Sequence, residues 1–307
     1  MDLYASGFNA WRQLEFDHDE PSDLTTNEPE DITSFRLVLS DALIELPCAL
    51  LSCTFVKTSS GLRHAGFADK SVETAGLREK LLASTAAIAG NGSIAVYDGG
   101  VGSIQQYDSM RSFAQASEQR RFPETKQVVQ LVAYETGFVA LTRDGCVWSW
   151  GDERYAACLG REITPSSPAE RPGIIEELED LPTGKIVKVA AAGYVVLALT
   201  EGHDLYAWGG HPGRQAILGD LTGSPAPVLV EECDILDCGA GDSHIIALTV
   251  DGDVYVIGDN ANGQLGLGVE KTATWVKVPL SLEEAQSVIG VRAGQRSSFI
   301  LTKRHVP

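Results

Sequence analysis

One segment constrains the fold of this chain more than any other: residues 235–268, ILDCGAGDSHIIALTVDGDVYVIGDNANGQLGLG. It contains four short β-rich runs separated by glycine turns, the last of them around Gln264–Leu267. The pair Asp251-Gly252 lies between two of these runs, and such a pair is a strong hairpin signal, because the turn that matches strand twist needs the positive φ that glycine adopts freely. The segment therefore predicts a four-stranded antiparallel unit.

The same pattern recurs along the chain, and one copy is divided between the two ends. The copies outside 235–268 are two clear ones at 128–162 and 186–219, two weaker ones at 43–67 and 81–98, and the divided one at 288–303 with 2–14. Four strands per unit, repeated at a period of about fifty to sixty residues, are typical of a β-propeller. We therefore predict an all-β propeller whose ring is closed by N- and C-terminal strands that share one blade.

The number of blades follows from the ends of the third strands. We place these ends at Gly7, Gly66, Asp98, Gly151, Gly209 and Gly258. They predict six blades, and a seventh would have to lie within 18–45 or 99–127. Because the repeats are continuous, we expect one propeller domain over residues 1–307 despite the length of the chain.

These motifs carry a family resemblance. GQLGLG after an asparagine-rich loop, the pattern ALTxDGxVYxxG and the divided unit resemble the regulator of chromosome condensation (RCC) repeat, whose propellers usually have seven blades. The expected fold is thus an RCC-type propeller of six or seven four-stranded blades. In size and acidity the chain is similar to the small fungal cytoplasmic α-tubulin suppressor type. That resemblance implies a small zinc protein as partner, in tRNA wobble-uridine modification and diphthamide synthesis.

The formal net charge of −18 sets limits on partners. Such an acidic surface repels phosphate, so we expect no direct DNA binding. Part of the charge lies in residues 15–31, which we interpret as an acidic insertion loop that either solubilises the chain or docks a basic partner. No run of eighteen apolar residues and no signal-peptide pattern is present, which predicts no membrane association and a cytoplasmic or nuclear location.

Residues 99–127 lack a clean strand period and contain Arg111, Arg120, Arg121 and Lys126. We interpret them as a blade-to-blade insertion, which is either plain structure or a docking site for an acidic partner.

No motif for catalysis or cofactor binding is present. The sequence has no nucleophile elbow, phosphate loop or dinucleotide fingerprint, and no histidine or second cysteine pair completes a zinc set. We therefore predict a protein that is not an enzyme and that has no catalytic residues, no cofactor and no metal.

Propellers bind partners through loops on the faces of the ring, so we select loop residues of types that are frequent at interfaces. The loops precede the second or the fourth strand of each unit. Trp11 is interpreted as replacing the glycine of the usual Gly-Gln-Leu pattern. The candidate partner-binding residues are Trp11, Arg12, Tyr134, Glu135, Arg154, Tyr155, Tyr194, His211, Asp242, His244 and Arg296.

Two of these candidates also follow from the resemblance. In exchange-factor members of the family, acidic and histidine residues of the turn before the second strand contact a small GTPase. Only Asp242 and His244 match that pattern here. For His244 we expect a structural hydrogen bond with a neighbouring loop.

The preferred function is a non-catalytic adaptor that holds another protein through the loops of one propeller face. One alternative is a guanine nucleotide exchange factor for a Ran-like small GTPase. The other is a chromatin or histone-demethylase-associated adaptor, because histones are basic and this chain is acidic.

Overall fold

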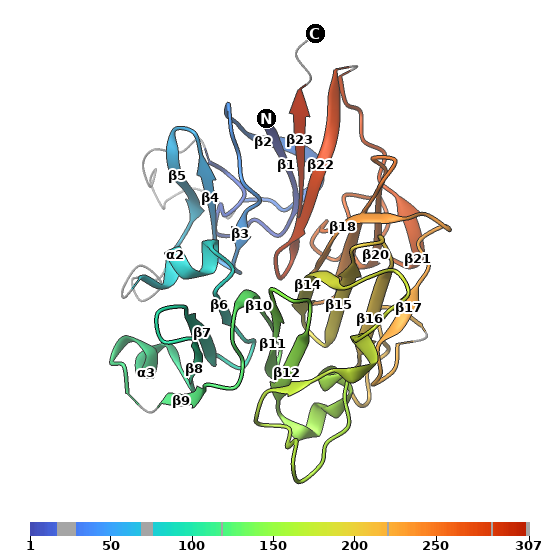
Figure 1. Ribbon diagram of the computed structural model, residues 1–307. Helices are drawn as coiled ribbons and strands as arrows, with labels where there is room; N and C mark the ends of the chain where they lie inside the picture. The colour runs from blue at the N-terminus through green and yellow to red at the C-terminus, as the bar shows by residue number, and fades with distance from the viewer. Residues whose placement is uncertain (17–28, 69–75, 118, 220, 284, 305–307) are drawn as a thin grey trace. The chain divides into compact units, whose positions relative to one another are not determined.

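The computed structural model describes residues 1–16, 29–68, 76–117, 119–219, 221–283 and 285–304 (Figure 1). They form two compact units. Unit 1 comprises the described residues of 1–68 and 230–307, and unit 2 those of 69–229. Most of the acidic segment 15–31, namely residues 17–28, lies outside the described residues. No helix in the described part of the chain is long and apolar enough to span a membrane.

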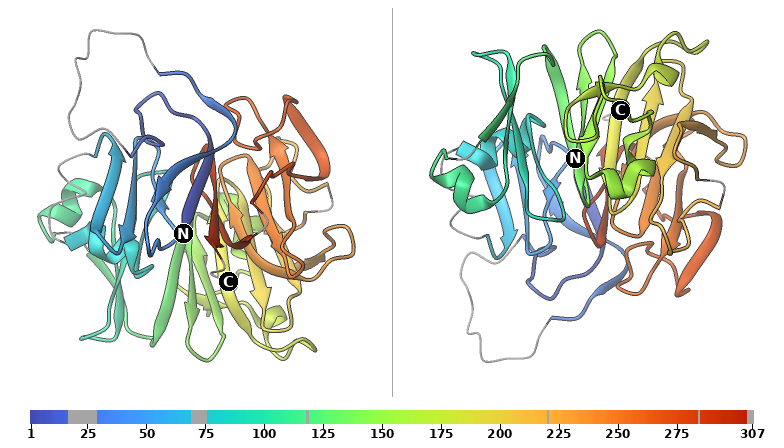
Figure 2. Two further views of the ribbon diagram at one scale, coloured as in Figure 1. Left: turned by 90° about the horizontal axis from the view of Figure 1, so that it is seen from above. Right: turned by 90° about the horizontal axis from the view of Figure 1, so that it is seen from below.

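The two ends of the chain share a sheet in unit 1, as the divided repeat predicts. The register pairs Asp2 with Thr302 and Gly7 with Ser297, without interruption between them. In Figure 2 the dark blue and dark red strands accordingly lie side by side in both views. The sheet has the order β2-β1-β23-β22, from β1 (Asp2–Gly7), β2 (Ile32–Ser40), β22 (Gln286–Ala293) and β23 (Ser297–Arg304).

Unit 1 contains two further sheets. Residues 235–268 supply three strands of a four-stranded sheet, and the fourth strand begins at Lys271, after the predicted position around Gln264–Leu267. The buried side chains of Gln264 and Leu265 belong to the loop before it. The strands are β18 (Ile235–Ala240), β19 (His244–Thr249), β20 (Val254–Asp259) and β21 (Lys271–Lys277). The other sheet has three strands in the described residues: β3 (Cys48–Ala49), β4 (Cys53–Thr58) and β5 (Gly61–Gly66).

Unit 2 contains three four-stranded sheets. The first comprises β6 (Ala86–Ile88), β7 (Ile94–Asp98), β8 (Ser103–Tyr107) and β9 (Gln119–Phe122). The second comprises β10 (Val128–Tyr134), β11 (Gly137–Thr142), β12 (Val147–Gly151) and β13 (Gly173–Ile174). The third comprises β14 (Ile186–Ala192), β15 (Val195–Thr200), β16 (Leu205–Gly209) and β17 (Ala226–Val228).

Four short helices complete the described structure. They are α2 (Leu77–Leu82), α3 (Met110–Ala114) and the 3-10 helices η2 (Glu153–Leu159) and η3 (Glu176–Leu178).

The interpretation of residues 99–127 as an insertion is wrong. They supply the third and fourth strands of the first sheet of unit 2, with α3 between them. Asp98 therefore ends the second strand and not the third. Its carboxylate accepts hydrogen bonds from the backbone of Gly100 and Val101, and Gly102 completes the turn with φ of 69°. The turn has four residues, 99–102, so it lacks the two-residue signal by which a hairpin is recognised in a sequence.

The second strands of the repeats explain why the pattern is readable. β11 (GFVALT), β15 (VVLALT) and β19 (HIIALT) are buried along their whole length. A short apolar run between turn signals is typical of a strand that is covered on both faces. The described residues thus contain six sheets, in agreement with the six predicted units.

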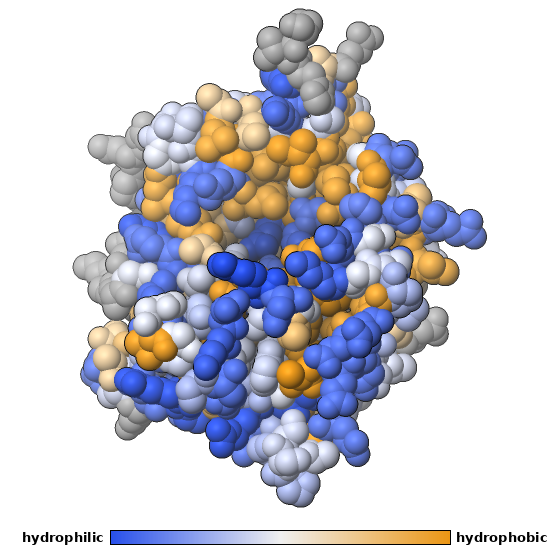
Figure 3. All heavy atoms as spheres, in the orientation of Figure 1, coloured by the Kyte–Doolittle hydropathy of each residue, from blue (hydrophilic) through white to orange (hydrophobic). Residues whose placement is uncertain are grey.

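The surfaces of the two units differ in the orientation of Figure 1. In unit 1, Figure 3 shows apolar residues gathered over β1, β22 and β23. In unit 2, it shows mainly hydrophilic residues over β8, β9 and β12.

Candidate partner-binding surface

Three predicted aromatic residues meet in unit 2, and we call them the Tyr155 cluster: Tyr155, Tyr194 and His211. Tyr155 lies in η2, Tyr194 in the turn before β15, and His211 directly after β16. The ring centroids are 5.2 Å apart for Tyr155 and Tyr194, 4.6 Å for Tyr194 and His211, and 5.5 Å for Tyr155 and His211. All three side chains are half-buried. Two neighbouring sheets thus present one aromatic surface.

Local hydrogen bonds hold η2 against the next sheet. The Asp152 carboxylate accepts from the Arg154 backbone N–H at 3.0 Å and so caps the start of the helix. At its other end, the Cys158 carbonyl accepts from the indole N–H of the buried Trp208 at 3.1 Å. The Cys158 thiol contacts the carbonyl of Tyr194 at 3.6 Å. These contacts of Asp152 and Cys158, and not the ring contact alone, therefore hold Tyr155 beside Tyr194.

Charged groups surround the cluster. The guanidinium of Arg214 lies 6.0 Å from the centre of the Tyr194 ring, within cation–π range. The backbone N–H of Glu135 donates to the Gly193 carbonyl at 2.7 Å, which places Glu135 next to Tyr194. Burial raises the pKa of the Tyr194 hydroxyl, and Tyr155 and the Glu135 carboxylate add to this effect. Tyr194 is thus a neutral hydrogen-bonding group at physiological pH.

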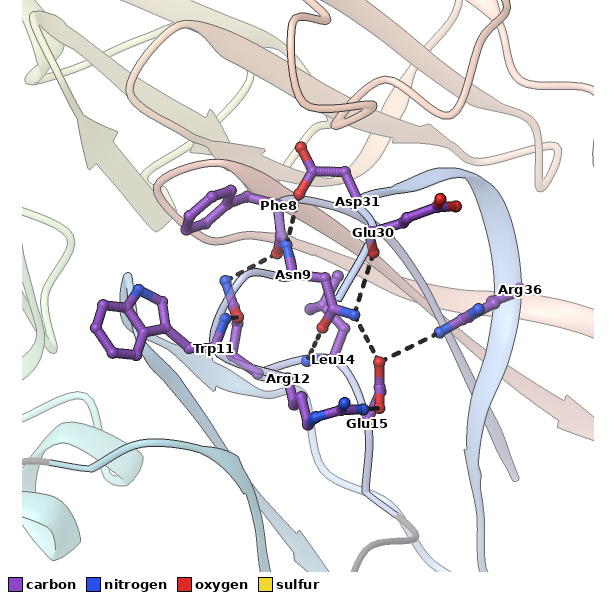
Figure 4. A network of polar contacts seen from close by, with 10 residues as sticks. Phe8, Asn9, Trp11, Arg12, Leu14, Glu15, Glu30, Asp31 and Arg36 are labelled. Atoms are coloured by element: carbon purple, nitrogen blue, oxygen red, sulfur yellow. Dashed lines mark hydrogen bonds and ion pairs between the residues drawn. The ribbon is translucent and has the colours of Figure 1, made fainter. Parts of the chain in front are cut away.

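A second group of candidates lies in unit 1, in the loop that follows β1 (Figure 4). Asn9 organises this loop, because its side chain accepts from the Leu14 N–H at 3.2 Å and donates to Glu15 at 2.7 Å. The Gln13 side chain accepts from the Trp11 N–H at 2.9 Å and donates to the Phe8 carbonyl at 2.8 Å. Arg12 pairs with Glu15 at 3.0 Å. The loop is therefore well connected internally.

Arg12, and not Trp11, occupies the glycine position of the Gly-Gln-Leu pattern. Its φ of 57° lies in the left-handed region, as does the φ of 79° at Gly263, the equivalent residue after β20. Trp11 corresponds instead to Asn262, because the backbone N–H of each donates to a glutamine side chain two residues later. The Trp11 side chain is 51% exposed, and its ring centroid lies 6.2 Å from that of Phe67, which is 60% exposed.

Two candidates are not at the surface. Tyr134 is 1% exposed and donates to the Trp150 carbonyl at 3.2 Å, because its ring fills the space above Gly137 and Gly151. His244 is wholly buried beneath Gly241. Both are core residues, and the prediction that they contact a partner is wrong.

The structural contact of His244 is with the Ser297 backbone at the start of β23. Within the described residues, neither ring nitrogen has a partner at strict hydrogen-bonding geometry. Burial lowers the pKa of His244 to about 4, and the Ser297 backbone opposes this shift only in part. The imidazole is therefore neutral in the folded protein.

The remaining candidates, Asp242, Arg296 and Arg154, are half-buried or exposed. Asp242 is half-buried, and its backbone N–H donates to the Gln295 carbonyl at 2.9 Å. Arg296 is exposed, with its guanidinium 5.9 Å from the centre of the Phe8 ring. Arg154 is exposed and pairs with Asp152 at 2.6 Å. Asp242 and Arg296 belong to unit 1 and Arg154 to unit 2, and each of these side chains is accessible at least in part.

Sequence reasoning missed Phe67 and did not select Phe8. Phe67 follows the last glycine of β5, and an apolar residue just after a strand end was the available signal. The described residues contain no group of three or more His, Cys, Asp or Glu side chains that could hold a metal ion.

Solved structures establish the class of fold. Prp20p of Saccharomyces cerevisiae superimposes with a TM-score of 0.70, covering 99% of this chain and 92% of its own at 15% identity. Human WBSCR16 gives a TM-score of 0.68, covering 99% of both chains at 13% identity. At such identities the likeness shows the fold alone, and that fold is an all-β propeller.

The repeat itself is recognised in the sequence. Residues 238–264 match the regulator of chromosome condensation (RCC1) repeat. The mouse E3 ubiquitin-protein ligase HERC2 is 33% identical over 190 residues, which are 58% of this chain and 4% of that protein. The mouse regulator of chromosome condensation is 30% identical over 171 residues, 54% of this chain and 39% of that protein. Residues 238–264 thus match one RCC1 repeat, and a little more than half of the chain is similar to these relatives.

The matched region spans less than half the length of these relatives. The similarity therefore does not extend to the activities and partners of these whole proteins. The narrower resemblance to the fungal α-tubulin suppressor type stays a prediction.

Proposed function

We propose that this protein is a non-catalytic protein–protein interaction adaptor that contacts its partner through the Tyr155 cluster. The observation that carries the proposal is the meeting of Tyr155, Tyr194 and His211, three half-buried rings from two neighbouring sheets. Tyrosine side chains that are rigidly held and partly exposed are enriched among the residues that dominate binding energy at protein interfaces. Tyr155 stands at a kink within η2, and the Asp152 cap at one end and the Trp208–Cys158 hydrogen bond at the other hold this segment in place before a partner arrives.

The chemistry of the partner follows from charge. With a formal net charge of −18, this chain attracts basic surfaces and repels acidic ones. The fold is compatible with protein partners, since the structurally similar Prp20p is described as binding Gsp1p and histones. The finer proposal, a small zinc protein that acts in tRNA wobble-uridine modification and diphthamide synthesis, rests on the resemblance in size and acidity alone.

The exchange-factor alternative is favoured by the likeness to Prp20p and opposed by one residue. Of Asp242 and His244, which the resemblance would assign to a GTPase contact, His244 is wholly buried and cannot touch another protein. The histone-associated alternative is favoured by the net charge and by the histone binding described for Prp20p.

The deciding experiment is quantitative affinity capture with the tagged chain. The variant Tyr155→Ala/Tyr194→Ala should lose its main partner by roughly thirtyfold or more, the effect of losing an interface residue that is worth about 2 kcal/mol. Tyr255→Ala, which changes a half-buried tyrosine of β20 in unit 1, is the matched control and should retain the partner. Equal capture by both variants would exclude the Tyr155 cluster as the contact.

The identity of the captured protein separates the functional classes. A zinc protein supports the finer proposal, and histones or a demethylase support the chromatin alternative. Acceleration of nucleotide release from a Ran GTPase by the purified chain would replace the adaptor proposal with the exchange-factor alternative.

A further inference from the structure

A pocket of about 240 Å³ lies in unit 2 between the β6–β9 sheet and the β10–β13 sheet. It is smaller than the roughly 300–1,000 Å³ that drug-sized ligands occupy, and therefore suits a single side chain. Turns of both sheets and the ends of β8, β9 and β12 contribute to its walls. Its polar lining consists of Asn91, Ser93, Gln106, Arg120, Thr136, Asp152 and Glu170.

The apolar part of the lining is aromatic. The pocket reaches Trp150 and Phe138, whose rings stack with centroids 5.4 Å apart. The Trp150 indole N–H donates to the Gln106 side-chain oxygen at 2.9 Å, which fixes the orientation of both groups. The Thr136 hydroxyl is buried and has no hydrogen-bond partner in the described structure. A buried hydroxyl without a partner is costly, so a ligand atom that bonds to it would gain free energy.

The charges around the pocket sum to an excess of negative charge. Arg120 pairs with Asp108 at 2.9 Å and Arg154 pairs with Asp152 at 2.6 Å, so these two pairs cancel. Glu170 is exposed and forms no direct ion pair among the described residues. Arg161 interacts with it electrostatically, but the Arg161 guanidinium is itself bonded to the Ser167 and Pro168 carbonyl oxygens. The Glu135 carboxylate adds a second negative charge, since it lies against Gly90, next to the lining residue Asn91. A cationic group is therefore favoured over an anionic one.

The pocket adjoins the Tyr155 cluster. The backbone N–H of Asp152 donates to the Thr136 carbonyl at 3.2 Å, and the backbone N–H of Tyr155 donates to the Asp152 carbonyl at 3.0 Å. Two wall residues of the pocket are thus connected to the cluster through backbone hydrogen bonds. The pocket and the cluster therefore share the loop that runs from Asp152 to Tyr155.

We infer that the pocket receives a basic side chain, arginine in preference to lysine, of a partner protein that docks on the Tyr155 cluster. This inference rests on the proposed function. A guanidinium combines a charge for Glu170, several N–H donors for the hydroxyl and carbonyl oxygens of the wall, and a flat face for the aromatic lining. Lysine supplies the charge but neither the planar face nor the forked donors.

The test uses three blocked pentapeptides, Gly-Ser-X-Ser-Gly, in which X is arginine, lysine or glutamate. Each is titrated into the full-length ¹⁵N-labelled chain while the indole N–H resonance of Trp150 is followed. The arginine peptide should shift that resonance in a saturable manner and more strongly than the lysine peptide, and the glutamate peptide should leave it unchanged. Glu170→Gln should weaken arginine-peptide binding by about twofold to fivefold, the range for an exposed ion pair.

Glu177→Gln is the matched control, because Glu177 is exposed in the same unit and does not line the pocket. It should bind the arginine peptide like the unmodified chain. Saturable binding of the glutamate peptide would overturn the inference and mark the pocket as an anion site. Absence of binding by all three peptides at millimolar concentration would also overturn it. The proposed function is judged separately, since Tyr155→Ala/Tyr194→Ala should lose the partner yet retain the peptide shift.

Discussion

Two sheets of unit 1 have the same four-stranded arrangement but different chain connectivity. The β18–β21 sheet is made from one continuous segment, whereas the terminal sheet joins β1 and β2 to β22 and β23 from the other end. Both nevertheless pair the end of the third strand with the start of the second, Gly258 with His244 and Gly7 with Ser297. The repeat is therefore specified by local residues and does not depend on continuity of the chain.

The loops that follow the third strands show the same agreement. In one, Asn260 accepts from the Leu265 N–H at 2.7 Å; in the other, Asn9 accepts from the Leu14 N–H at 3.2 Å. What differs is the remaining residues: Trp11 stands in place of Asn262 and Arg12 in place of Gly263. Buried hydrogen bonds keep the loop shape, while the side chains at two equivalent positions differ: Trp11 is exposed and Arg12 is half-buried.

The largest expected effect comes from breaking the terminal sheet. Deleting residues 1–8 removes β1 and with it Leu3 and Ala5, which are fully buried. Loss of a buried leucine side chain alone costs about 2–5 kcal/mol, and the deletion also opens the edge of β23. We expect the free energy of unfolding to fall by more than about 5 kcal/mol in a denaturant titration. A truncated chain that unfolds like the intact one would show that the terminal pairing contributes nothing.

The next largest effect is a pH dependence of stability caused by His244 in the β18–β21 sheet. The terminal sheet has Ser297 at the equivalent position and lacks this group. His244 has a pKa of about 4 when folded, against 6.5 when exposed, so the folded state resists protonation. Its contribution to stability is complete above pH 6.5 and is lost as the pH falls towards 4, by up to about 3 kcal/mol. His244→Ser, which installs the residue of the terminal sheet, should flatten the stability profile between pH 6.5 and 4. An unchanged slope would assign this dependence to other groups.

Asn9→Ala and Asn260→Ala test whether the two loops are equivalent in energy. Each removes an acceptor and a donor from a buried hydrogen-bond network, and each should cost about 1–3 kcal/mol. The two values, measured by thermal and chemical unfolding, should agree within about 1 kcal/mol. A much smaller loss for Asn9→Ala would show that two contacts independent of the Asn9 side chain suffice to hold the terminal loop: the Asn9 backbone N–H donating to Asp31 at 2.9 Å and the Arg12–Glu15 ion pair.

The smallest effect is expected at the glycine position. Arg12→Gly relieves a left-handed conformation but loses an exposed ion pair, so stability should change by less than about 1 kcal/mol. Gly263→Ala is the informative counterpart. Its Cβ would lie 2.7 Å from the Ile32 carbonyl oxygen and the Thr33 Cα, which should cost about 1–3 kcal/mol. If both variants lose similar stability in unfolding titrations, the expected difference between the Arg12 and Gly263 positions is wrong.

The sequence predicted the propeller, the divided sheet and the six units because these depend on short-range signals. Strands such as HIIALT and VVLALT are apolar throughout and are bounded by turns, so their type and order can be recognised locally. Residues 99–127 were misinterpreted because the β7–β8 turn uses an aspartate and three glycines without the two-residue hairpin signal. The candidate site was predicted in part: Tyr155, Tyr194 and His211 were selected, but nothing in the sequence showed that they meet.

Residue type alone could not show that Tyr194 is accessible and Tyr134 is buried, because both are tyrosines at the turn before a second strand. Tyr134 turns inward because Gly137 and Gly151 leave space for its ring, while Tyr194 contacts rings from two loops. The sequence by itself determined the strands, their pairing and the charge of the molecule, since these follow from periodicity, turn chemistry and composition. Only the tertiary structure decided which loop side chains are accessible and which gather into one surface, because packing between sheets depends on residues far apart in the chain.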